Sequence, residues 1–138
     1  MLHLLNYLPN QLAQYIKDNN KKLYIYGAGM IGRIVIPDYL VRNNIQDKVI
    51  CYIDSDIRKH GDTVTVGERK ITICSLEDAG EWNEDIVLII TNSNYSEIVS
   101  RFDTLEYMNC LDAVIYPVIK TIEVENKSKE HTDVLIDY

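Results

Sequence analysis

One short stretch limits what this chain can fold into more than any other part of it. Residues 23–26, Leu-Tyr-Ile-Tyr, form an apolar run rich in β-forming residues, and glycines follow at positions 27, 29 and 32. A buried strand followed by glycines at G-x-G-x-x-G spacing predicts a tight turn that leads into a helix. We therefore expect an α/β protein in which the first strand of a parallel sheet ends at this turn.

Each glycine of the motif has a separate physical task. Gly27 permits the tight turn, Gly29 lets a pyrophosphate approach the backbone, and Gly32 allows the helix to pack closely on the strand. The first amides of the helix and the positive end of its dipole favour an anion. The predicted cofactor-binding residues of the turn are Gly27, Ala28, Gly29, Met30, Ile31 and Gly32.

Beyond the turn, helical and strand patterns alternate along the chain. Strands are predicted at residues 48–53, 71–73, 85–90 and 111–116, with a short hairpin around 63–66. Helices are predicted at 2–18, from 31 to about 42 with a kink at Pro37, from Ser75, and at 96–108. This alternation predicts a Rossmann-like, doubly wound parallel sheet of about five strands in the order 3-2-1-4-5, with an extra N-terminal helix.

The same patterns suggest a division of the chain. Residues 1–20 form a helix packed on the domain, residues 21–120 form the nucleotide-binding domain, and residues 121–138 form a polar tail or the start of a following segment. The tail ends in the apolar run Val134-Leu135-Ile136, for which an edge strand, a partner contact and the beginning of a further domain stay open.

Polar side chains follow two of the predicted strands, at the edge where open α/β sheets bind ligands. Asp54 lies about 20 residues beyond Gly32, where a dinucleotide fold places the carboxylate that holds a ribose diol. The alternative is that Asp54 starts a solvated loop with the residues after it. Asn92 belongs to a loop of small polar residues, 91–94, which either contacts a ligand or forms an Asx turn before the next helix.

The sequence supplies no convincing catalytic or metal-binding set. Tyr116 and Lys120 have the spacing of a Tyr-x-x-x-Lys pair, which needs both residues one helical turn apart. Pro117 directly follows a predicted strand, so we assign no catalytic residue. The three histidines, 3, 60 and 131, are far apart and lie in polar or terminal segments, so no metal site is predicted.

Composition narrows the partners and the compartment. The formal net charge of −7 argues against a nucleic-acid partner, because affinity for a phosphate backbone comes from clustered Lys and Arg. The cysteines at positions 51, 74 and 110 are scattered and suggest reduced thiols. There is no signal-peptide pattern, and no apolar run approaches the roughly 18 residues of a membrane span, so we expect a cytoplasmic protein.

These motifs together resemble a known group of proteins. The run from Tyr24 to Gly32, the segment Tyr52-Ile53-Asp54-Ser55-Asp56, the Gly-containing loop to a short strand and the run 85–90 are similar to a small Rossmann-like, CoA-binding-like domain. That domain precedes nucleoside-diphosphate-sugar epimerases and dehydratases of surface-polysaccharide biosynthesis, and similar ones accompany sugar O-acetyltransferases and FkbM-type methyltransferases. The resemblance covers about residues 20–117.

The resemblance implies binding of NAD or a nucleotide-sugar at the glycine turn and Asp54, with the catalytic chemistry in a following domain. Three alternatives stay open. The first is the N-terminal domain of a sugar-modifying methyltransferase or acetyltransferase. The second is a minimal NAD-dependent epimerase or dehydratase that uses Tyr116 and Lys120. The third is a regulatory or interaction domain without a ligand, which associates with itself or with another protein through its N-terminal helix or its tail.

Overall fold

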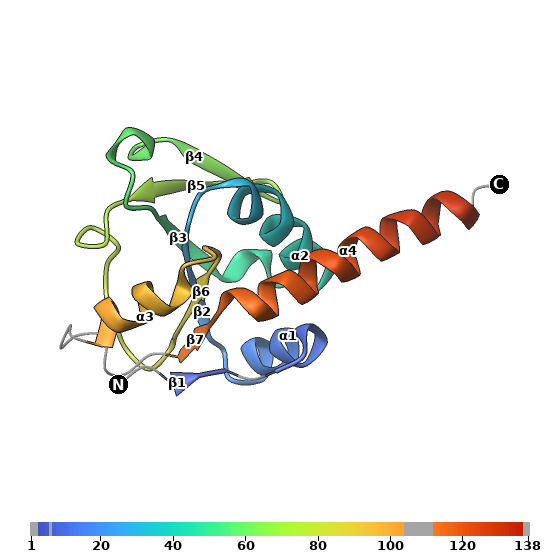
Figure 1. Ribbon diagram of the computed structural model, residues 1–138, viewed down its shortest axis with the longest axis horizontal. Coiled ribbons are helices and arrows are strands. Elements are labelled where there is room, and N and C mark those ends of the chain that lie inside the picture. Colours follow the sequence, from blue (N-terminus) through green and yellow to red (C-terminus); the bar gives the residue numbers. More distant parts are fainter. Residues whose placement is uncertain (1–2, 6, 104–111, 137–138) are drawn as a thin grey trace.

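The computed structural model describes residues 3–5, 7–103 and 112–136 of the chain. Within these residues, one seven-stranded sheet runs through the centre of the molecule in the order β1-β7-β6-β2-β3-β5-β4 (Figure 1). Neighbouring strands are parallel, except that β4 and β5 form an antiparallel hairpin. The strands are β1 (His3–Leu4), β2 (Lys22–Tyr26), β3 (Val49–Ile53), β4 (Thr63–Val66), β5 (Arg69–Cys74), β6 (Ile86–Ile90) and β7 (Asp112–Val114).

The five predicted strands occupy the centre of this sheet. They are β2, β3, β5, β6 and β7, and their spatial order is the predicted 3-2-1-4-5. The sheet goes beyond the five predicted strands at its edges: β1 pairs with β7, and the predicted hairpin around 63–66 is present as β4, which pairs with β5. The α/β, Rossmann-like fold class is therefore confirmed.

Helices cover both faces of the sheet (Figure 1). Alternate side chains of β2 point to opposite faces: Leu23 and Ile25 belong to one apolar core, and Tyr24 and Tyr26 belong to the other. The first core is closed by α1 (Pro9–Asp18), α2 (Ile36–Arg42) and α4 (Tyr116–Ile136). The second core is closed by α3 (Tyr95–Asp103). The predicted extra N-terminal helix is thus present as α1, but it begins at Pro9 and not at residue 2, and His3–Leu4 form β1 instead.

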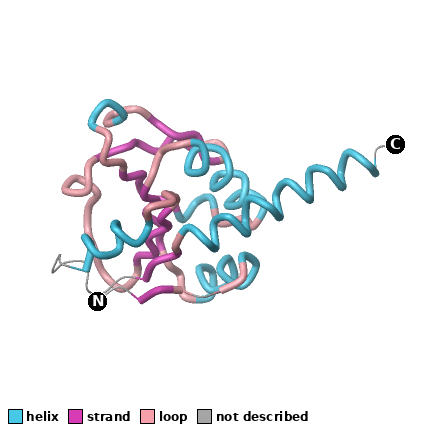
Figure 2. The backbone as a smooth tube through the Cα atoms, in the orientation of Figure 1, coloured by secondary structure: helices cyan, strands magenta, loops and turns pink. Residues whose placement is uncertain are grey.

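An irregular connection joins β5 to β6 and covers part of the second face (Figure 2). The predicted helix from Ser75 is only a turn, in which the Ser75 hydroxyl oxygen accepts a hydrogen bond from the Asp78 N–H at 3.3 Å. Farther along the connection, the ring of Trp82 packs edge-on against Tyr24, with centroids 4.7 Å apart. The described residues 75–85 therefore cover this part of the face without forming a regular helix.

The helix after the glycine turn has two parts. Residues Ile31–Val35 form a π-helical turn, and α2 continues from Ile36 with Pro37 in its first turn. Pro37 has no N–H to donate to the turn before it, and that turn is π-helical rather than α-helical. The irregularity predicted at Pro37 is therefore present as a change of helix type just before it.

The C-terminal segment differs most from the sequence-based prediction. Strand β7 ends at Val114, two residues before the predicted end, and Tyr116 begins the 21-residue helix α4. Pro117 lies in the first turn of this helix. Ile119 and Ile122 are fully buried in the first core, so the beginning of the predicted tail is part of the domain. Figure 1 shows α4 continuing well beyond the sheet.

Two further predictions meet the limits of the described residues. The predicted helix 96–108 is observed as α3 as far as Asp103, and its remaining residues lie outside the described ranges, as does Cys110. Among the helices that the structure describes, none is both long enough and apolar enough to cross a membrane.

Candidate functional site

Packing inside the protein explains two of the three motif glycines. Gly27 has φ +112°, and a Cβ added there would lie 2.2 Å from the Thr91 hydroxyl oxygen. A Cβ added at Gly32 would lie 2.0 Å from the Gly27 carbonyl oxygen. Real Cβ atoms do not approach other atoms so closely. Gly27 and Gly32 are therefore required by the turn and by the contact between helix and strand, as the sequence predicted.

Gly29 is different, because nothing inside the protein requires a glycine there. A Cβ at this position meets no atom within 4 Å, and its φ lies outside the left-handed region. Gly29 faces a hollow of about 340 Å³ at the carboxyl ends of β2 and β6. The hollow is lined by Gly29, Met30, Ile31, Thr91, Asn92, Ser93, Asn94 and Tyr116.

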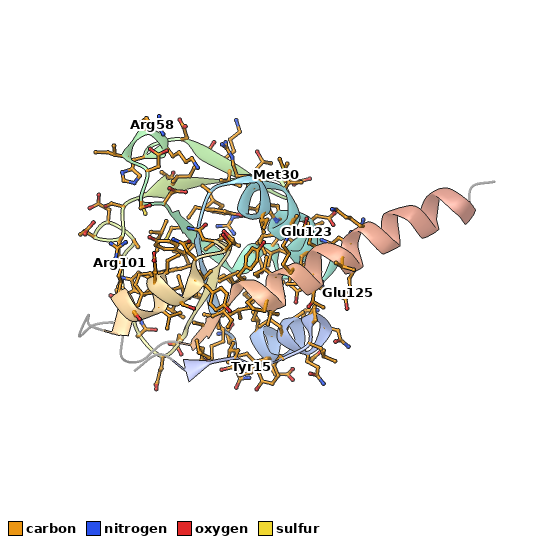
Figure 3. The ribbon with its side chains drawn as sticks, viewed as in Figure 1. Tyr15, Met30, Arg58, Arg101, Glu123 and Glu125 are labelled. Carbon is orange, nitrogen blue, oxygen red and sulfur yellow. The ribbon has the colours of Figure 1, made fainter. Side chains whose placement is uncertain are left out.

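Apart from Asp54, the predicted cofactor-binding residues divide into two groups. Gly29, Met30, Ile31 and Asn92 line the hollow together, and the side chain of Met30 is 77% exposed (Figure 3). Gly27, Ala28 and Gly32 are buried beneath it and shape the turn. The structure thus brings half of the predicted residues to one open surface, where the first amides of the helix have no partner in a preceding turn.

Asp54 closes the glycine turn from the neighbouring strand. Its Oδ2 accepts a hydrogen bond from the Ala28 N–H, and its Oδ1 accepts one from the Asp56 N–H, both at 2.8 Å. The Lys59 ammonium lies 3.6 Å from Oδ2. A carboxylate has about four acceptor sites, so a ribose hydroxyl can still share it. Ribose contact stays a prediction, and the described role of Asp54 is to hold the turn.

A second hollow, of about 490 Å³, opens beside Asp54 at the ends of β2, β3 and β5. Its lining is mixed: Tyr26, Ile53, Ile57 and Leu76 are apolar, and Asp54, Ser55, His60, Ser75, Glu77 and Arg101 are polar. An apolar lining with a few convergent polar groups is typical of small-molecule sites. Both hollows lie at the carboxyl edge of the sheet, where the fold class binds its ligands.

The loop after β6 supports the glycine turn and also faces the first hollow. The Thr91 hydroxyl donates to the Tyr26 carbonyl oxygen at 3.0 Å, and this side chain is buried. The Asn94 backbone carbonyl accepts hydrogen bonds from the Glu97 and Ile98 N–H groups and so begins α3. Asn92 lines the hollow, and both of its predicted roles, ligand contact and turn formation before α3, stay open.

Tyr116 and Lys120 are placed differently from the prediction. Because α4 begins at Tyr116, the two side chains lie one turn apart on one helix, with the Lys120 ammonium 5.5 Å from the centre of the Tyr116 ring. Hydrogen bonding raises the pKa of Lys120, with Tyr116 as the larger cause and Glu123 as the second. Tyr116 also lines the first hollow. The objection that Pro117 prevents a helix was wrong, since Pro117 lies in the first turn of α4.

The histidine and the cysteines near the site contact other groups of the protein or are buried in it. His60 Nε2 lies 2.7 Å from the Asp54 carbonyl oxygen, at the rim of the second hollow. Cys51 and Cys74 are free thiols, and burial raises the pKa of both. Among the side chains that the structure describes, no three His, Cys, Asp or Glu residues gather in a way that could hold a metal ion.

Comparison with known proteins adds no relative. No family model matches this sequence, and neither a curated protein nor a solved structure matches it. The resemblance of residues 20–117 to sugar-nucleotide enzymes therefore rests on the residue pattern, and the α/β fold with mostly parallel strands is compatible with it.

Proposed function

We propose that this chain is a nucleotide-binding domain that takes NAD or a nucleotide-sugar at its glycine turn. One observation carries the proposal: Gly29 has no steric or conformational reason inside the protein to be a glycine, and it faces a hollow. A ligand that comes close to the backbone gives such a reason. The adjoining helix start supplies amide donors for a phosphate group.

The surrounding residues fit such a ligand. The two hollows lie along one edge of the sheet, and Asp54 and Asn92 provide oxygen and amide groups beside them. By the resemblance of its motifs, the domain serves a nucleoside-diphosphate-sugar epimerase or dehydratase in surface-polysaccharide biosynthesis. Within the same proposal, a sugar-modifying methyltransferase or acetyltransferase is the alternative setting.

Replacing Gly29 with valine tests the binding site. We expect Gly29→Val to keep the fold, because its side chain enters open space, and to weaken binding of NAD or UDP-glucose at least tenfold, because it occupies the phosphate's approach. Isothermal titration calorimetry and ligand-induced shifts in melting temperature measure the effect.

Thr65→Val is the matched control, since it places a valine on an exposed strand position outside both hollows. Equal binding by Gly29→Val and the control contradicts the proposal. If no nucleotide shifts the melting temperature of the unmodified chain, the domain is instead an interaction module.

A second candidate function follows from the position of Tyr116. Tyr116 lines the hollow, and the Lys120 ammonium lies 5.5 Å from the centre of its ring. A tyrosine hydroxyl is one of the groups that can act as a general acid or base. The chain would then itself be a minimal NAD-dependent epimerase or dehydratase. We expect purified protein to convert a UDP-sugar and Tyr116→Phe to lower the turnover at least 100-fold, within the range attributed to general acid–base catalysis. Absence of turnover by the unmodified chain, assayed with NAD present, removes this candidate.

A further inference from the structure

One carbonyl group of the helix after the glycine turn needs a hydrogen-bond donor from outside that helix. In the π-helical turn, the Ile36 N–H donates to the Ile31 carbonyl oxygen, five residues back. The next bond of this kind would join residue 37 to the Gly32 carbonyl oxygen, but residue 37 is a proline and has no N–H. Within the described helix, neither Ile36 nor Pro37 is therefore available to the Gly32 carbonyl group.

The donor comes from the neighbouring strand. Tyr52 lies on β3, which is next to β2 in the sheet (Figure 1), and its hydroxyl donates to the Gly32 carbonyl oxygen at 2.6 Å. The side chain of Tyr52 is fully buried, and burial raises the pKa of its hydroxyl, which therefore keeps its proton. Because Gly32 is buried as well, water cannot easily replace this hydrogen bond if it is lost.

The position of Gly32 connects this hydrogen bond to the candidate site. Gly32 directly follows Gly29, Met30 and Ile31, which line the first hollow. Groups that bind a ligand must be held to within about 0.5 Å of their productive positions by residues that are themselves fixed. A bond that fixes the Gly32 carbonyl group also fixes the amides of the three residues just before it.

We propose, on the basis of the proposed nucleotide site, that Tyr52 is a positioning residue for the phosphate-binding amides. Its hydroxyl takes the place of the N–H that Pro37 lacks and so holds the first turn of the helix in the form that binds the ligand. The Tyr52 side chain lies in the first core and is absent from the described lining of both hollows. Its effect on a ligand therefore passes through Gly32.

Tyr39 offers a matched control in the same core. It is almost fully buried, burial raises the pKa of its hydroxyl, and this hydroxyl donates to the Pro9 carbonyl oxygen at the start of α1. Tyr52→Phe and Tyr39→Phe each remove one buried hydroxyl and one hydrogen bond to a backbone carbonyl oxygen. Only the bond made by Tyr52 concerns the glycine turn.

Titration calorimetry with NAD and UDP-glucose, well below the melting temperature, separates positioning from stability. We expect both variants to lower the melting temperature by about 3 to 10 °C, because each leaves a buried carbonyl group unpaired. Tyr52→Phe should also weaken the binding of whichever probe the unmodified chain takes by about fivefold or more, whereas Tyr39→Phe should stay within about twofold. In amide NMR spectra without ligand, the resonances of residues 29–31 should shift in Tyr52→Phe and not in Tyr39→Phe.

A further substitution tests the role given to Pro37. Pro37→Ala restores an N–H that can donate to the Gly32 carbonyl oxygen, so the Tyr52 hydroxyl should matter less. In the Pro37→Ala background, adding Tyr52→Phe should change the affinity by less than about twofold. A loss as large as in the unmodified background contradicts the exchange of hydroxyl for N–H.

Two other results overturn the inference while leaving the nucleotide site in place. One is an unchanged affinity in Tyr52→Phe when Gly29→Val blocks binding. The other is an equal loss of affinity in Tyr52→Phe and Tyr39→Phe, which would follow from any disturbance of the core. If the unmodified chain binds neither probe, the proposed function and this inference both fail.

Discussion

Gly32→Ala is expected to lower the free energy of unfolding by about 3 kcal/mol, the upper part of the range for overpacking a well-packed position. The added methyl group would lie 2.0 Å from the Gly27 carbonyl oxygen, which is a backbone atom and cannot rotate away. The Gly32 carbonyl oxygen also accepts a hydrogen bond from the buried Tyr52 hydroxyl at 2.6 Å. Moving the helix to relieve the clash therefore disturbs a second contact.

Gly29→Ala is the control, because it adds the same methyl group three residues earlier, where no atom lies within 4 Å. Its effect should stay within about 0.5 kcal/mol, as for other substitutions that touch nothing. Urea unfolding followed by circular dichroism measures both variants, with equal slopes showing that the transition stays two-state. Similar midpoints for the two variants would contradict the geometry of the turn.

Ile122→Ala should lower the free energy of unfolding by about 2 to 5 kcal/mol, because it removes a fully buried side chain. Ile122 lies on α4 and packs in the core that this helix shares with α1 and α2. The prediction separates the observed arrangement from a polar tail, in which no residue of this segment would matter for stability.

The same helix offers the control for this substitution. Val124 is 62% exposed, and Val124→Ala should change the free energy of unfolding by no more than about 0.5 kcal/mol. Thermal unfolding by calorimetry is suitable, since both variants lose only aliphatic carbon. If Ile122→Ala proves as mild as Val124→Ala, the first turns of α4 do not belong to the core.

The sequence predicts the centre of the fold well, because buried parallel strands have a strong local signal. The runs around Leu23 and Leu88 are apolar on both faces and too short for helices, so their type is settled without tertiary information. Strand β1 has two residues, and so short a pairing leaves no pattern. It forms where the chain passes beside β7, and it is itself the edge strand of the sheet.

The prediction fails at the C-terminal segment for a different physical reason. A proline can end a strand and can also occupy the first turn of a helix. Only the first of these roles was predicted for Pro117. Val118, Ile119 and Ile122 do have helical spacing, but the charged residues after them hid the stripe. Because the helix was missed, the placement of Tyr116 beside Lys120 and at the hollow was missed with it.

The candidate site, too, was predicted only where its residues are close together in the sequence. The glycine turn is local in sequence, and its three glycines predict both the tight turn and the open position at Gly29. The bond from the Ala28 N–H to Asp54 joins residues 26 positions apart, and the approach of Lys59 depends on the loop that follows. Contacts of this kind arise from the packing of two strands, so no pattern within either segment could show them.

The hydrogen bond from the Ala28 N–H to Asp54 also affects how tightly a ligand binds. Since the turn is already held by Asp54 and by Thr91, folding has removed its conformational freedom before any ligand arrives. Binding to a preorganised loop loses little further entropy, and the free and bound backbones should coincide. We expect the Ala28 amide to exchange slowly with deuterium in the free protein, at a rate that nucleotide binding slows only as far as it stabilises the whole domain.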